Sequence, residues 1–181
     1  HSHYSLLQAL PKIEHLIAAA KENRMDTLAL TDNGNLYGAI EFYKAAKEEK
    51  IKPIIGVDFY VALGSRKDKR PGIDNRRTRL VLLAENKEGY QNLIKLVTDS
   101  NLEGFYYKPR VDLETLALWK EGLIAIIPAF GSSVGIALRA NDTAKAREHL
   151  DVYTNIYGKD GTFLELTSHP EIDDHEELMT R

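Results

Sequence analysis

Short apolar runs alternate with segments of helical period along most of this chain, and that alternation restricts the folds open to it. Apolar side chains recur at the i, i+3, i+4 and i+7 spacing in residues 11–23, which predicts a helix there. The same test predicts helices at residues 37–50, 87–101 and 143–157. Strands are predicted at residues 27–30, 53–63, 79–84, 123–127 and 163–167. Strand followed by helix, several times over, is typical of a parallel α/β sheet or barrel with right-handed crossovers.

Length and composition narrow the classes of protein further. The 181 residues suffice for one compact domain and are marginal for two, so we expect a single domain over residues 1–181. The apolar runs are too short to span a bilayer, and cysteine is absent, which excludes disulfides and cysteine nucleophiles. We therefore expect a cytoplasmic protein with no membrane partner. The chain starts at His1 and stops inside a helix-like stretch, so we expect a fragment of a longer polypeptide.

One segment departs from the alternation because it is strongly basic. The whole chain has 24 Lys and Arg against 27 Asp and Glu, so its net charge of −3 creates no global field that attracts nucleic acid. Between residues 64 and 79, however, only Asp68 and Asp74 oppose a set of basic residues: Arg66, Lys67, Lys69, Arg70, Arg76, Arg77 and Arg79. We expect an exposed, mobile connection. The functional alternative is contact with a DNA phosphate backbone through Arg66, Lys67, Lys69 and Arg70.

Polar residues stand where the predicted strands end. Asp32 and Asn33 follow one strand, Asp58 lies in the next, and residues 129–133 follow a later one. Ligands of parallel α/β folds collect at the carboxyl ends of strands, so these residues are candidates for a site.

Histidines supply further candidates, although each signal is weak. His1 and His3 form a His-x-His pair, which binds a catalytic metal only when several other His and carboxylate groups converge with it. We interpret Glu165 and His169, near the C-terminal end, as structural or surface residues.

A run of short motifs makes a specific resemblance. The motifs, in chain order, are YSLL at residues 4–7, LALTD at 28–32, GNLYG at 34–38, EFYKAA at 41–46, IKPIIG at 51–56, LLAEN at 82–86, GYQNL at 89–93 and GFYYKPR at 104–110. Together they resemble the PHP (polymerase and histidinol phosphatase) domain, in the version found at the N-terminus of bacterial DNA polymerase III alpha subunits. The resemblance covers nearly the whole chain. It implies an α/β fold, a distorted parallel β/α barrel with outer helices, here clipped at both ends.

The resemblance also assigns positions to a metal site. The family's opening motif is His-x-His-Ser, a variable residue and Tyr-Ser, so His1 matches the second motif histidine and His3 falls at the variable position. The other matched positions are Gln8, Asn33, Asp58, Arg79 and Ala129, where metal-binding members have an acidic residue, a histidine, a glutamate, a histidine and a cysteine.

These replacements predict a vestigial site. An amide is a poor substitute for imidazole or carboxylate towards a divalent ion, and Arg79 brings a fixed positive charge. Only His1 and Asp58 keep ligand character, so we expect no metal and no catalytic residue in this domain. We expect Arg79 to pair with Asp58 and to replace part of the lost metal charge.

The function implied by the resemblance belongs to DNA replication. It is a structural or subunit-docking role within a DNA-directed DNA polymerase, a nucleotidyltransferase that uses magnesium, template–primer DNA and deoxynucleotides. A proofreading exonuclease subunit is an implied partner. The alternative is a metal-dependent phosphoesterase, either a 3′–5′ proofreading exonuclease or an enzyme like histidinol-phosphate phosphatase. Gln8, Asn33 and Arg79 count against that alternative.

Overall fold

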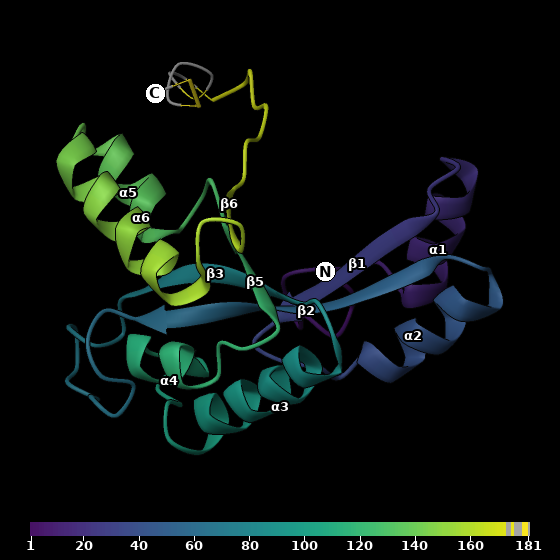
Figure 1. Cartoon of the computed structure of the whole chain (residues 1–181), viewed down its shortest axis with the longest axis horizontal. Coiled ribbons are helices and arrows are strands. Elements are labelled where there is room, and N and C mark those ends of the chain that lie inside the picture. The colour runs from purple at the N-terminus through teal and green to yellow at the C-terminus, as the bar shows by residue number, and fades with distance from the viewer. Residues whose placement is uncertain (173–174, 176–178, 181) are drawn as a thin grey trace.

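The computed structural model describes residues 1–172, 175 and 179–180, and within them a mixed α/β fold is built on one sheet (Figure 1). Its six strands are β1 (Thr27–Asn33), β2 (Lys52–Ala62), β3 (Arg77–Ala84), β4 (Arg110–Val111), β5 (Leu123–Ile127) and β6 (Thr162–Leu164). The helices are α1 (Ile13–Glu22), α2 (Ala39–Glu48), α3 (Lys87–Leu102), α4 (Leu113–Leu118), α5 (Ser133–Arg139) and α6 (Thr143–Tyr157). The strands lie in the order β1-β2-β3-β5-β6, and β4 pairs with β2 outside this path.

Strand direction corrects the expectation of a parallel sheet. The pairs β1–β2, β2–β4 and β5–β6 are parallel, whereas β3 runs antiparallel to both β2 and β5. Helix α2 supplies the crossover that a parallel β1–β2 pair requires. Between β2 and β3 the chain has no crossover helix, and a direct return of this kind joins antiparallel neighbours.

Most predicted elements are confirmed with small shifts at their ends. The strand at 123–127 and the helix at 143–157 match β5 and α6, whereas the strand predicted at 163–167 ends at Leu164. The periodicity analysis missed β4, α4 and α5, which are too short to show a period. Side-chain caps mark the two missed helices, since Asp112 accepts the Thr115 N–H and Ser132 accepts the Gly135 N–H. No helix in the described part of the chain is long and apolar enough to cross a membrane.

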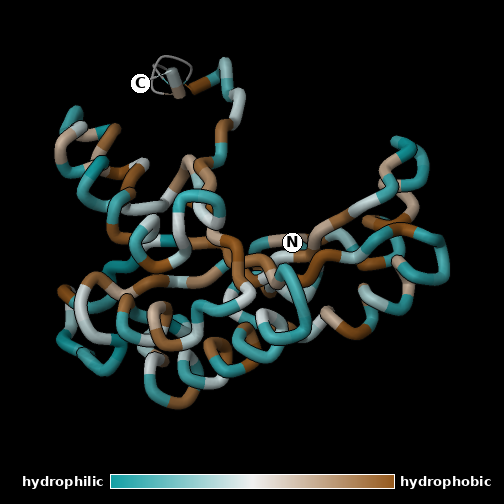
Figure 2. The backbone as a smooth tube through the Cα atoms, viewed as in Figure 1, coloured by the Kyte–Doolittle hydropathy of each residue, from teal (hydrophilic) through white to brown (hydrophobic). Residues whose placement is uncertain are grey.

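The two faces of the sheet have different surroundings. One face and the helices beside it form the main core, with Val57, Phe59, Leu80, Leu82, Leu93, Leu96, Leu116 and Ala125 among its buried residues. A smaller core joins α1, α2 and β1. Figure 2 shows hydrophobic residues gathered along the central strands. Pairing of Thr31 with Gly56, Gly56 with Leu83, and Val81 with Ile126 places the opposite set of side chains on a second face. Thr31, Val81 and Ile126 are only half-buried there, so this face is partly open.

The basic segment between β2 and β3 is anchored to the rest of the fold. The backbone N–H of Arg66 and its Nη1 both donate to Asp112 Oδ2, at 2.9 and 3.1 Å, and its Nη2 donates to Glu103 at 2.6 Å. Arg110 is fully buried and donates to the backbone carbonyl oxygens of Arg66 and Asp68. The expectation of an exposed, mobile connection is therefore wrong for the part of the segment around Arg66.

This anchoring divides the four residues expected to contact DNA. Arg66 is only 8% exposed, and its guanidinium is already paired with carboxylates, so its prediction as a phosphate contact is corrected. Arg70 is exposed but pairs with Asp74 at 2.8 Å. Lys67 and Lys69 are exposed, and their contact with DNA stays a prediction.

Candidate functional site

The partly open face of the sheet brings His1, Asn33, Asp58 and Arg79 together. Strand register explains the arrangement, because Asn33 pairs with Asp58 across β1 and β2, and Arg79 pairs with Tyr60 across β3 and β2. Arg79 Nε donates to Asp58 Oδ1 at 3.0 Å, and Arg79 Nη2 donates to both Asp58 Oδ2 and Asn33 Oδ1. The predicted pairing of Arg79 with Asp58 is confirmed.

The loop after β5 holds Arg79 in place. The Arg79 N–H donates to the carbonyl oxygen of Gly131 at 2.9 Å. Gly131 has φ of 75°, and a Cβ at this position would lie 3.2 Å from Arg79 Cδ. Glycine therefore supplies both the left-handed backbone and the room for the arginine stem.

Burial and charge act in opposite directions on Asp58. The residue is 4% exposed, and this burial raises the pKa of its carboxyl group, while the hydrogen bond and charge of Arg79 act to lower that pKa. Burial acts to lower the pKa of Arg79, but the Asp58 carboxylate, with smaller contributions from Tyr60 and Glu165, offsets this and leaves the pKa raised. The guanidinium therefore stays charged and supplies the local positive charge that a buried carboxylate requires.

His1 and Glu165 border the same site. His1 Nε2 lies 3.5 Å from Asp58 Oδ2, and the two residues line a cavity of about 380 Å³ with Arg79, Phe130 and Glu165. The Glu165 carboxylate accepts the backbone N–H of Ala129 at 3.0 Å, and its charge raises the pKa of Asp58. His3 instead packs its ring on Tyr4, with centroids 4.2 Å apart.

The interpretation of Glu165 as a structural or surface residue missed its place at the site. Glu165 directly follows β6, and β6 pairs in parallel with β5, so it lies at the same sheet edge as Ala129. The rule that ligands collect after parallel strands could have found it.

Two matched positions, Gln8 and Ala129, have other partners. The Gln8 amide exchanges hydrogen bonds with the Tyr60 hydroxyl, at 3.0 and 3.2 Å. Ala129 takes part through its backbone, because its carbonyl oxygen accepts Arg139 Nη1 at 3.0 Å while its N–H binds Glu165.

A second buried carboxylate fixes the segment that carries His1. Asp32 is 2% exposed and accepts the Ser2 N–H at 2.6 Å, the Ser2 hydroxyl at 2.8 Å and the Ser5 hydroxyl at 2.7 Å. The Ser5 hydroxyl in turn accepts the Asn33 N–H at 3.0 Å. These bonds join residues 1–5 to the end of β1 and so position His1 at the site.

The donors present do not fit a catalytic metal cluster. Such a cluster needs several imidazole or carboxylate groups that face one point. Here the Arg79 guanidinium occupies both Asp58 oxygens and the Asn33 amide oxygen. Within residues 1–172, 175 and 179–180, no group of three or more His, Asp or Glu side chains is placed to hold a metal ion.

A solved structure defines the class of fold. A protein from Bifidobacterium adolescentis, described as a metal-dependent phosphoesterase, aligns with a TM-score of 0.57 over 94% of this chain and 77% of its own. The sequence identity is 9%, so this likeness shows the fold alone. The class is an α/β domain that shares its fold with that protein, and its strand-end site here contains an arginine–carboxylate pair.

Sequence comparison gives the family. The chain belongs to the PHP domain family, which it matches over residues 1–169. It is 43% identical over 170 residues to DNA polymerase III subunit alpha of Borreliella burgdorferi and 41% identical over 175 residues to that of Thermus aquaticus, each match covering 93% of this chain. The chain spans only 15% and 14% of the length of those two relatives. The family resemblance read from the motifs is confirmed.

Proposed function

We propose that this chain is the N-terminal PHP region of a replicative DNA polymerase III alpha subunit, with a structural or subunit-docking role. The observation that carries the proposal is the 43% identity to such a subunit over 93% of the chain. The chain spans about 15% of that relative, and the proposal assigns nucleotide transfer to the rest of the parent polypeptide.

The geometry of the site supports a role without hydrolysis. Arg79 binds Asp58 and Asn33 from the neighbouring strands, so the pair joins β1, β2 and β3 where a metal-binding relative would place ligands. A fixed guanidinium also repels a divalent cation. The site thus stabilises the sheet edge and neither binds a metal nor activates water.

The proposal includes a barrel. The outer strands of the described path are β1 and β6, and the face that carries Asp58 has half-buried residues such as Val81 and Ile126. An apolar sheet face needs a covering layer. Closure into a distorted β/α barrel, with β3 as an antiparallel member, would provide it.

The partners and location follow from the parent protein. They are template–primer DNA and deoxynucleotides, bound with magnesium by the polymerase, and a proofreading exonuclease subunit that docks on the assembly. The location is the cytoplasm. The similarity to alpha subunits in the two bacterial relatives supports each of these assignments.

The second candidate is a metal-dependent phosphoesterase, of the proofreading-exonuclease or histidinol-phosphate-phosphatase type. The fold shared with the Bifidobacterium adolescentis protein favours it. The Arg79–Asp58 pair opposes it, because the pair occupies the carboxylate that such chemistry would use.

The test is an activity comparison on the full-length parent polypeptide. We expect it to extend a primed template with deoxynucleotides and Mg²⁺. We also expect no release of phosphate from p-nitrophenyl phosphate, and no shortening of single-stranded DNA, with Mn²⁺ or Zn²⁺. Hydrolysis that disappears in an Asp58→Asn variant would establish the phosphoesterase instead. Absence of primer extension would contradict the polymerase assignment.

A further inference from the structure

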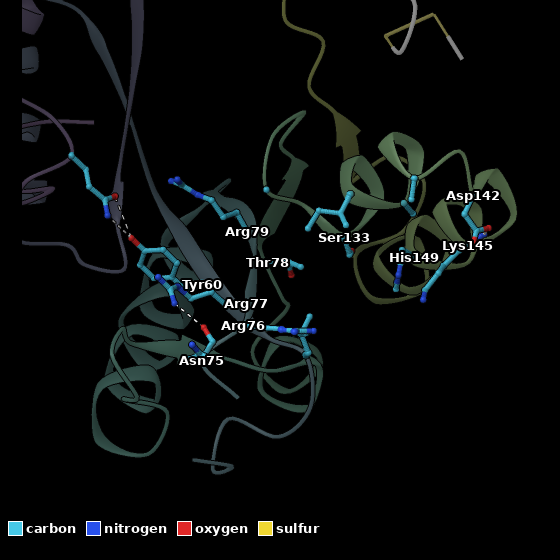
Figure 3. Close-up of a pocket in the computed structure, with 16 residues that line it drawn as sticks. Tyr60, Asn75, Arg76, Arg77, Thr78, Arg79, Ser133, Asp142, Lys145 and His149 are labelled. Atoms are coloured by element: carbon cyan, nitrogen blue, oxygen red, sulfur yellow. Dashed lines mark hydrogen bonds between the residues drawn. The ribbon is translucent and has the colours of Figure 1, made fainter. Parts of the chain in front are cut away.

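A second hollow lies beside the site, between the start of β3 and the helices α5 and α6 (Figure 3). We call it the basic groove; its volume is about 950 Å³. Asn75, Arg76 and Arg77 line one side, and Ser133, Asp142, Lys145 and His149 line the other. It differs from the cavity between His1 and Glu165, although Arg79 borders both.

Positive charge dominates the lining of the basic groove. Arg76 and Lys145 are exposed, and neither forms an ion pair with any described residue. Arg77 Nη1 donates to the Asn75 carbonyl oxygen at 2.8 Å, and the guanidinium lies 5.3 Å from the centre of the Tyr60 ring. Among the described residues, Asp142 is the one carboxylate in the lining, and its Oδ1 accepts the Lys145 N–H at 2.9 Å as the cap of α6. The groove is thus a local positive region in a chain of net charge −3.

These features point to phosphate groups. Guanidinium forks match phosphate oxygens, and cations on both sides allow a chain of phosphates to run between them. The Tyr60 ring that borders the groove is 5% exposed, so it offers no open face on which an unpaired base could stack. The lining therefore favours the backbone of a duplex over a single strand with exposed bases.

We infer that the basic groove binds the phosphate backbone of duplex DNA without reading its sequence. This inference rests on the proposed function, because a polymerase parent is what would supply the duplex DNA. It moves the predicted DNA contact from Arg66 and Arg70 to Arg76, Arg77 and Lys145. Carboxylates already pair with Arg66 and Arg70, whereas Arg76 and Lys145 are open to a phosphate.

The experiment measures how binding of a 30-base-pair duplex by the parent polypeptide depends on salt. Each phosphate contact contributes about 0.9 to the log–log slope, so Arg76→Ala with Lys145→Ala should reduce its magnitude by about 1–2. Two exposed cations outside the groove supply the control, Lys87→Ala with Arg147→Ala, which removes the same charge and should leave the slope unchanged. Lys67→Ala with Lys69→Ala tests the loop in the same way.

The possible outcomes separate the inference from the proposed function. An unchanged slope in Arg76→Ala with Lys145→Ala, in a parent that extends primers, would overturn the basic groove alone. A parent that neither binds nor extends DNA would overturn the proposed function and this inference with it. If the groove variant weakens binding of poly-glutamate but leaves the duplex slope unaltered, the groove binds an acidic protein segment and the DNA inference is wrong.

Discussion

At the residue scale, Arg79 and Asp58 form a pair in which replacement of one partner alone should destabilise the fold. Asp58 is buried on a sheet face, so its carboxylate requires a nearby cation or a proton. Metal-binding members of the family have a ligating histidine at the position that matches Arg79. In this chain the arginine provides positive charge there without a metal. Burial raises the pKa of Asp58 and Arg79 gives the main opposition to that shift, so removal of Arg79 lets the pKa rise further.

Replacement of Arg79 with leucine should therefore destabilise the protein and make its stability depend on pH. We expect a loss of about 2 kcal/mol, below the about 3–5 typical of a broken buried pair, because the Arg79 side chain is 32% exposed. Folded Asp58 would then bind its proton more tightly than the unfolded chain does. Stability should fall as pH rises from about 4, the ordinary value for Asp, through the raised folded pKa. Urea unfolding between pH 4 and 8 measures both effects.

The double variant Asp58→Asn with Arg79→Leu is the control for that prediction. It removes the uncompensated carboxylate, so it should recover most of the lost stability and flatten the pH profile. Equal stability of Arg79→Leu and the unmodified protein at every pH would contradict the account.

Replacement of Asp32 should also lower stability, through the hydrogen bonds that hold residues 1–5. Asp32→Asn removes the negative charge and one acceptor from a carboxylate that receives hydrogen bonds from Ser2 and Ser5. A hydrogen bond to a charged group contributes about 1.5–3 kcal/mol, so we expect a loss of about 2 kcal/mol. Hydrogen exchange of the Asn33 amide, which donates to Ser5, should accelerate as residues 1–5 loosen. An exchange rate equal to that of the unmodified protein would show that these bonds do not anchor the segment.

At the scale of elements, the β2–β3 connection and α4 form one unit. Asp112 caps α4 and also accepts hydrogen bonds from Arg66, so the same carboxylate fixes a helix start and a loop. Further along the loop, the hydrogen bond from Arg70 lowers the pKa of Asp74 to about 2. The fold thus neutralises Arg66 and Arg70 of this basic segment and leaves the charges of Arg76 and Arg77 without a carboxylate partner among the described residues.

Substitutions of two neighbouring residues in this loop should have very different effects on the stability of the fold. Arg66→Ala should cost about 3 kcal/mol, because Asp112 would remain buried without its cation. Lys67→Ala removes an equal charge from an exposed side chain and should change stability by less than about 0.5 kcal/mol. Urea unfolding at pH 7 compares them, and similar losses for the two variants would show that the loop is not anchored through Arg66.

At the scale of the whole molecule, the sequence predicted which segments pack but not how all of them run. A short apolar run located β5, and helical periodicity located α6, because both elements bury apolar side chains in a regular pattern. Neither pattern carries information on strand direction, so the strand of β3 was predicted but its antiparallel direction was not. The Asp58–Arg79 contact was expected because both residues match metal-ligand positions of the family, and such positions lie close together in space. Arg66 was misjudged because its partner Asp112 approaches it only through folding. Glu165 was misjudged although its position after β6 could have placed it at the site.

The central claim is that an arginine–carboxylate pair occupies the site and that the domain binds no metal there. Thermal unfolding of the parent polypeptide with and without Mn²⁺ or Zn²⁺ tests it most directly. A metal at a hundred times its dissociation constant adds about 2.7 kcal/mol, or about 5–11 °C for a domain of this size. Because the polymerase centre proposed for the parent also binds divalent ions, the shift that counts is the part that depends on Asp58. We predict the same metal response in the unmodified protein and in Asp58→Asn, and metal binding at this site only after Gln8→Asp, Asn33→His and Arg79→His are combined. A shift of that size in the unmodified protein, lost in Asp58→Asn, would contradict the account.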